Sequence, residues 1–309
     1  MSTQSVLFDA PGPKARVRHA ISGVVISLAL LAILAYLVLQ LVNKGQFSAV
    51  KWRPFLTGEI WTSYLLSGIL GTLEAAAISV VLAGILGLLL GVGRLSQNVG
   101  IRWIAGVFTE FFRAVPVLMM MFFAFAVYGR FGLVPSNFLA LAATVTGLTF
   151  YNGSVIAELI RSGVQSLPRG QREAGLSLGL RNLGALRYIL LPQAITAMLP
   201  SLISQLVVVL KDTALGYNVT YDELLNKASQ IGNYKQNLIP AFMVVAALYI
   251  IINYTIARLA GTIERKLRSR GIQPQTGVDE QAPLLAGAPA AVVDPPPPDG
   301  PATGRHPGS

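Results

Sequence analysis

The sequence predicts an all-α membrane protein with about six spanning helices, and two observations carry this prediction. Of its 309 residues, 53% are hydrophobic and only 12% are charged, against about 25% charged residues in a typical soluble domain. Several runs contain no charged residue over roughly 18 positions or more, the length that spans a bilayer as a helix. Because these runs are continuous rather than alternating, helices are favoured over the strands of a membrane barrel.

Six runs are interpreted as spans, the third being shorter but rich in Met and Phe. They are Ala20–Asn43, Ala75–Gly93, Ala114–Gly129, Phe131–Ala157, Tyr188–Leu210 and Gln236–Ala257. The first run is too long for the apolar core of a signal peptide, which usually has about 7–15 residues, and no small-residue cleavage pattern follows it. We therefore expect it to be retained as a helix.

Lysine and arginine set the orientation, because cytoplasmic loops carry an excess of them. With the N-terminus inside, sixteen basic residues fall on the inner side: Lys14, Arg16, Arg18, Arg94, Arg102, Arg113, Arg161, Arg169, Arg172, Arg181, Arg187, Arg258, Arg265, Lys266, Arg268 and Arg270. Seven fall on the outer side: Lys44, Lys51, Arg53, Arg130, Lys211, Lys227 and Lys235. The sequence therefore predicts that both termini are inside.

Composition divides the chain into a helical core with flanking segments. The expected parts are a cytoplasmic tail 1–19, an N-terminal spanning helix 20–43, an external connection 44–63, a transmembrane domain 64–270 and a tail 271–309 rich in Pro and Ala. The external connection has room for an interfacial helix bearing Trp52 and Trp61. The last tail is expected to be disordered and cytoplasmic, because it lacks aromatic residues and contains a run of four prolines.

Several classes of function are excluded by what the sequence lacks. It has no cysteine, and its histidines, His19 and His306, lie in the tails, so thiolate metal sites and an interior histidine base are excluded. It has no G-x-x-x-x-G-K-[ST] motif for a nucleotide phosphate. The net charge of +10 comes from clusters between apolar runs, which is typical of membrane topology and not of nucleic-acid binding.

A charged segment, Arg161–Pro192, interrupts the apolar sequence and is long for a connection between helices. Its pattern predicts one helix from Gln171 to Leu178, closed by Gly179 in a left-handed conformation. A second helix is expected from Arg181 to Leu191, interrupted by Pro192. The pattern alone fits two roles: an interfacial helix anchored by arginines, or a docking element for a cytoplasmic partner.

The stretch "EAGLSLGLRNLGALRYILLP" resembles the EAA signature of ABC-importer permeases. The matching residues are Glu173, Ala174, Gly175, Gly179, Ile189, Leu191 and Pro192. Gly175 departs from the pattern, which has a third alanine there. The resemblance implies that this segment is a coupling helix, which sits in a groove on the ATPase subunit and passes the closing of its nucleotide-binding domains to the membrane helices.

Three more stretches are similar to motifs of the polar amino acid branch, the histidine, glutamine, arginine and glutamate permeases. They are "EFFRAVPVLMMMFF", "VIAELIRSGVQSLPRGQREAG" and "LKDTALGYNVTYDELL", and they keep Arg113, Pro116, Glu158, Arg161, Pro168, Gly170, Gln171, Lys211, Asp212, Thr213 and Leu215. They depart from the family at Ala114, Val115, Met120, Val155 and Ala214. The resemblance covers about residues 64–262 and is strongest to actinobacterial glutamate permeases.

The resemblance implies a type I ABC importer permease fold, with a five-helix core and one additional N-terminal helix, in the bacterial plasma membrane. The implied function is that of the permease subunit of an ATP-driven importer of polar amino acids, glutamate first, with glutamine or arginine as alternatives. The implied partners are a second permease, two ATP-binding subunits and an extracytoplasmic solute-binding protein. The chain itself is then no enzyme and binds no cofactor, and ATP and Mg belong to the ATPase.

Two groups of residues follow as candidates. The residues expected to couple to the ATPase are Gly170, Gln171, Glu173, Ala174, Gly175, Gly179 and Pro192. The residues expected at a gate or along the translocation path are Glu74, Arg113, Pro116, Glu158, Arg161, Lys211, Asp212 and Thr213.

Each candidate gate residue also fits an ordinary structural role. A structural ion-pair cluster is favoured over a substrate contact for Arg113, Glu158 and Arg161. Glu74 is close enough to the interface to be solvated, although an acid within a span is functional by default. Lys211 and Asp212 fit an interfacial anchor pair as well as a gate contact.

For Met119–Met121, a role in packing is favoured over a metal site.

The alternative from another class of function is a stand-alone ion-coupled transporter. It would be expected to have inverted repeats and acidic residues at mid-membrane, and neither is found in the sequence.

Overall fold

The computed structural model describes residues 12–270, which are almost entirely helical. The long helices are α1 (Pro13–Asn43), α4 (Leu66–Arg94), α5 (Val99–Ala114), α6 (Val117–Phe131), α7 (Leu139–Gln165), α10 (Leu191–Asp212) and α12 (Leu238–Arg270). The predicted tail 271–309 lies outside the described residues. Helix α1 begins at Pro13 and not at Ala20, so the expected tail 1–19 includes the start of the helix. A proline in the first turn of a helix needs no hydrogen-bond partner for its nitrogen.

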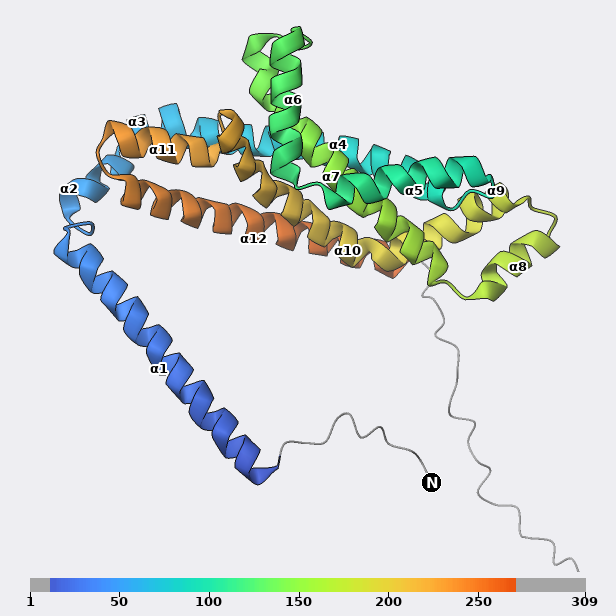
Figure 1. The fold of residues 1–309 in the computed structure, drawn as a ribbon, viewed down its shortest axis with the longest axis horizontal. Coiled ribbons are helices and arrows are strands. Elements are labelled where there is room, and N and C mark those ends of the chain that lie inside the picture. The colour runs from blue at the N-terminus through green and yellow to red at the C-terminus, as the bar shows by residue number, and fades with distance from the viewer. Residues whose placement is uncertain (1–11, 271–309) are drawn as a thin grey trace, which may run out of the picture. The chain divides into compact units, whose positions relative to one another are not determined.

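Five helical segments of the described chain are long and apolar enough to cross a membrane, or six if the bent pair α5 and α6 counts as one span. The predicted span Ala114–Gly129 corresponds to α6, but α6 begins only at Val117, and it counts as a span only together with α5. Val115 is extended, and Pro116 directly precedes α6, because a proline disfavours helical geometry in the residue before it. The two helices meet at 101°, and α6 turns away from the direction shared by α4, α10 and α12 (Figure 1).

The core of the fold is the contact between α4 and α7, which is made by small residues. On α4 the buried positions include Gly68, Thr72, Ala76, Ser79, Ala83, Gly87 and Gly91, spaced by three or four so that they share one face. A Cβ atom placed on Gly87 would lie 2.6 Å from Cγ2 of Ile156 and 2.9 Å from the carbonyl oxygen of Gly153, both on α7. The two backbones therefore approach closely, which is how membrane helices gain van der Waals contact.

A cap closes one end of the bundle and is formed by residues 44–65 and 220–237. It contains α2 (Ala49–Trp52), a 3-10 turn (Arg53–Leu56), α3 (Gly58–Ile60), a π-turn (Trp61–Leu65) and α11 (Leu224–Tyr234). Phe55, Ile60, Leu224 and Ile231 are buried together there. The single interfacial helix expected to bear Trp52 and Trp61 is thus replaced by several short helices. Both indole nitrogens donate to backbone carbonyls, of Gln46 and Phe55 respectively.

The other end of the bundle holds the charged segment, as Figure 1 shows with α8 and α9 at the end opposite to α3 and α11. Between the two ends, Met121 packs with Leu148 and Val219 in a buried cluster. The expectation that Met119–Met121 serves packing holds for Met120 and Met121, whereas Met119 is exposed. The apolar window of α1 is wholly exposed, which fits a helix added outside the core.

Candidate functional site

The charged segment begins with a short helix that ends as the sequence predicts. Helix α8 spans Arg169–Ser177, and Gly179 follows with φ of +82°. The amide of Gly179 donates to the carbonyl of Leu176, and the amide of Leu180 donates to the carbonyl of Gly175. This pair of hydrogen bonds is the Schellman ending, which needs a left-handed residue and therefore favours glycine.

The second helix of the charged segment differs from the prediction. Helix α9 (Asn182–Ala185) continues through a π-turn (Leu186–Leu190) directly into α10, so Pro192 does not interrupt the helix. Pro192 lies instead just after the π-turn, at the start of α10, and such local π adjustments let a continuous helix accommodate a proline. The π-turn before it is the kind of local widening that helices use at such irregular points.

Gly175 is the point at which α8 touches the following helix. It is buried, and a Cβ atom placed on it would lie 2.8 Å from Cδ1 of Ile189 and 3.2 Å from Cβ of Ala185. Arg172 donates to Oδ1 of Asn182 at 2.8 Å, and Gln193 donates to Oε1 of Gln171 at 3.2 Å. The glycine in place of the alanine of the signature therefore has a structural reason, because the two helices cross at this residue.

The opposite face of the segment is open. Gly170, Glu173 and Ala174 are exposed there, and so are Leu178 and Leu183, with exposed fractions of 81% and 67%. Gln171 is also exposed but lies on the side of Gly175, where it accepts from Gln193. Behind them, Val164, Leu186, Leu190 and Ala194 form a buried cluster that fixes the segment to the bundle. One side of the segment is thus anchored, and the other presents a carboxylate beside apolar side chains.

The contact at Gly175 leads to a testable prediction. Gly175→Leu should force α8 away from Ala185 and Ile189, because overpacking a close contact costs about 1–3 kcal/mol. Limited trypsin digestion of membranes should then cleave more rapidly at the arginines of the segment. Ser177→Leu adds the same side chain at an exposed position of α8 and should not change the rate. Equal rates for both variants would contradict the packing role of Gly175.

Ion pairs join three helices near the charged segment. Arg161 contacts Glu158 at 2.5 Å, and Arg94 contacts Glu158 at 2.9 Å and Glu110 at 3.0 Å. Arg113 joins the same network as predicted, but through an ion pair with Glu110 at 3.5 Å and not through a direct one with Glu158. Arg94 and Glu110 were missed by the sequence analysis. Glu110 opens the motif stretch quoted above, so its position was the one available signal.

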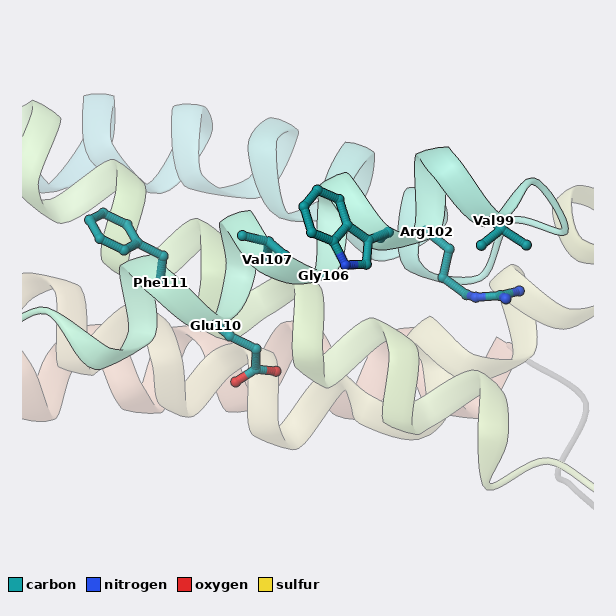
Figure 2. Close-up of a pocket in the computed structure, with 7 residues that line it drawn as sticks. Val99, Arg102, Gly106, Val107, Glu110 and Phe111 are labelled. Carbon is teal, nitrogen blue, oxygen red and sulfur yellow. The ribbon is translucent and has the colours of Figure 1, made fainter.

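Helix α5 has a shallow groove of about 660 Å³ on its exposed face. Figure 2 shows Arg102, Glu110 and Phe111 along the helix, and Trp103 also lines the groove. The groove holds no cluster of titratable groups that suggests chemistry. Across residues 12–270, no group of three or more His, Asp or Glu side chains could hold a metal ion.

The candidate residues for the outer part of the translocation path do not form one site. Glu74 is exposed on α4, and Lys211 is exposed at the end of α10. Lys211 lines a pocket of about 640 Å³ with Phe242, Tyr249 and others, and Glu74 is not among the lining residues. Thr213 is buried, and its hydroxyl donates to the carbonyl of Leu210.

A buried carboxylate in the cap was also missed. Glu223 is fully buried and accepts hydrogen bonds from the amides of Leu225 and Asn226 and from the hydroxyl of Tyr249. Burial raises the pKa of Glu223 above its ordinary value. The amide of Leu224 donates to Thr72 of α4, so this site joins the cap to the core. Glu223 was quoted within a motif stretch, but nothing in the local pattern indicated its burial.

Known proteins resemble this chain along most of its length. Residues 83–269 match the family described as binding-protein-dependent transport system inner membrane component. The glutamate transport system permease protein GluD of Corynebacterium glutamicum is 48% identical over 230 residues, 74% of this chain and 84% of that protein. The glutamate/aspartate import permease protein GltK of Escherichia coli is 30% identical over 208 residues, 66% and 93% of the two chains.

A solved structure supports the same assignment. The crystal structure of an amino acid ABC transporter with histidines contains a chain that is 28% identical and aligns with a TM-score of 0.60, over 67% of this chain and 95% of that one. The type I importer permease fold expected from the motifs is thereby confirmed, and the apolar spans make this a multi-pass plasma membrane protein. The chain belongs to the family of binding-protein-dependent transport system inner membrane components.

Proposed function

We propose that this chain is the membrane-spanning permease subunit of an ATP-driven importer of polar amino acids, with glutamate as its principal substrate. The assignment of glutamate as the substrate rests on the 48% identity to the glutamate permease of Corynebacterium glutamicum over 84% of that protein. Relatives near 30% identity are named for other substrates, such as glutamine and histidine. Glutamine and arginine therefore remain the alternatives to test.

The proposed assembly pairs this chain with a second permease, two ATP-binding subunits and an extracytoplasmic solute-binding protein. The binding protein delivers the amino acid at the cap end, and the charged segment contacts the ATPase in the cytoplasm. Support comes from the open face of α8 around Glu173 and from its anchored opposite side. ATP and Mg are bound by the ATPase, and this chain performs no covalent chemistry.

The translocation path is proposed to run along the surface that two permeases share. Glu74 and Lys211 are charged and exposed near the outer ends of spanning helices, where an ionised side chain still favours water or a polar partner over lipid. Both side chains are therefore better placed against water or a second subunit. Arg113, Pro116, Glu158 and Arg161 belong to the inner gate, and Asp212 and Thr213 to the outer end of α10.

The test is uptake of labelled amino acids by proteoliposomes that contain this chain, its neighbouring permease, the ATPase and the binding protein. Saturable uptake of glutamate that requires ATP is the expected result. ATP-dependent uptake of another amino acid, with none of glutamate, would correct the substrate. Uptake by this chain alone, driven by an ion gradient, would contradict the proposed function.

A further inference from the structure

The guanidinium of Arg94 joins three helices. Arg94 is the last residue of α4, and its side chain is 13% exposed. Its Nη2 atom lies 3.0 Å from Oε1 of Glu110 on α5, and its Nη1 atom lies 2.9 Å from Oε2 of Glu158 on α7. Two nitrogens of the planar group thus lie within ion-pair distance of two carboxylates in a fixed geometry, which the single nitrogen on the flexible stem of a lysine does not fix in the same way.

These contacts continue toward the charged segment. Glu158 is also held by Arg161, whose Nε and Nη2 atoms donate to its two oxygens at 3.1 and 2.5 Å. Arg161 in turn donates to Oε1 of Gln165, the last residue of α7. The chain enters α8 shortly afterwards, at Arg169. Polar contacts therefore connect the base of the charged segment to α5 without a break.

Aromatic packing holds another face of α5 against α7. The rings of Phe112 and Phe150 stack with centroids 4.7 Å apart, and Phe108 meets Phe150 edge-on at 5.9 Å. Phe150 belongs to α7, which is itself packed closely on α4 at Gly87 and Gly91. Shortly after Phe112, α5 ends at Ala114 and meets α6 at an angle of 101°. The point between the two helices that can absorb a change of angle is the extended pair Val115 and Pro116.

We propose that Arg94 is a positioning residue for transport, which holds α5 to α4 and α7 as one rigid unit. Movement of the charged segment then reaches α5 through this unit, and the angle to α6 changes at Val115–Pro116. This inference rests on the proposed function, because it concerns how ATP hydrolysis drives transport. It assigns roles to Arg94 and Glu110 that the family motifs do not give.

The first test compares two Arg→Lys variants in the reconstituted complex, with uptake per ATP hydrolysed as the readout. Arg94→Lys keeps the charge and loses the fixed geometry of the two ion pairs. This variant should lower the uptake per ATP hydrolysed by at least about fivefold, which is the lower end of the typical coupling between two sites. Arg102→Lys is the control, since Arg102 is exposed on α5 and donates to the carbonyl of Ser96 in the loop before that helix. An unchanged ratio in Arg94→Lys would overturn the proposal.

The second test replaces the ionic link by a covalent one, for which a chain without cysteines is well suited. A Cβ atom placed on Gly93 lies 3.1 Å from Cβ of Ala105, which a small shift brings to the roughly 3.5–4.5 Å of a disulfide. Oxidised Gly93→Cys with Ala105→Cys should transport normally and should restore the ratio in the Arg94→Lys background.

Two outcomes of the second test would overturn the rigid unit. One is loss of uptake on oxidation with recovery on reduction, because α5 would then have to move relative to α4. The other is failure of the disulfide to rescue Arg94→Lys. A wild-type complex without ATP-dependent uptake would instead contradict the proposed function, so the two failures can be distinguished.

Discussion

Glu173→Lys is expected to abolish ATP-dependent uptake while the permease remains in the membrane at its normal level. Glu173 is exposed on α8, and within residues 12–270 it takes part in none of the ion pairs that hold the fold together. The fold therefore loses nothing when the charge is reversed. A surface that contacts Glu173 would meet a repelling charge instead, and like charges across an interface cost several kcal/mol.

The measurement is uptake in proteoliposomes, combined with copurification of the ATPase from detergent. Gln97→Lys is the matched control, because Gln97 is an exposed residue in the loop between α4 and α5. It adds a similar positive charge outside α8 and should leave uptake unchanged. Normal uptake by Glu173→Lys would refute the assignment of α8 as the docking helix.

Gly87→Val should have the largest effect on the folded protein itself. Even its Cβ atom would lie within 3 Å of Ile156 and of the backbone oxygen of Gly153, and a backbone atom cannot rotate away. Overpacking typically costs about 1–3 kcal/mol and occasionally more. The α4–α7 contact is central to the bundle, so we expect little folded protein in the membrane.

The melting temperature in detergent and the yield from membranes measure this effect. Gly84→Val provides a close control, since Gly84 lies on the same helix and a Cβ atom there meets nothing within 4 Å. It should retain the yield and the melting temperature of the wild type. Equal losses in both variants would show that valine harms α4 through its helix propensity and not through its contact with α7.

The sequence sufficed for the features that depend on local pattern. Charge-free runs predicted α1, α4, α7, α10 and α12, because a bilayer requires unbroken apolar length. Helix α5 was missed because Arg102, Glu110 and Arg113 interrupt its apolar pattern. The left-handed Gly179 was predicted because its conformation is set by its own backbone and needs no distant partner.

Contacts between distant residues could not be predicted in the same way. The spacing of small residues on α4 was visible in the sequence, but its partner face on α7 was not. Arg94 was counted for topology only, since nothing near it in the chain indicates Glu158. For the same reason Glu223 was not recognised as buried, because its hydroxyl partner is Tyr249 on the following helix.

The buried Glu223 also bears on the order in which the protein is assembled during synthesis. Its hydroxyl partner, Tyr249, lies on α12, and the amide of the neighbouring Leu224 donates to Thr72 near the start of the core. While the ribosome is still making α12, Glu223 lacks the hydroxyl of Tyr249, and burial of its carboxylate is less favourable. Closure of the cap around Glu223 therefore depends on α12 and is expected late in the assembly of the core.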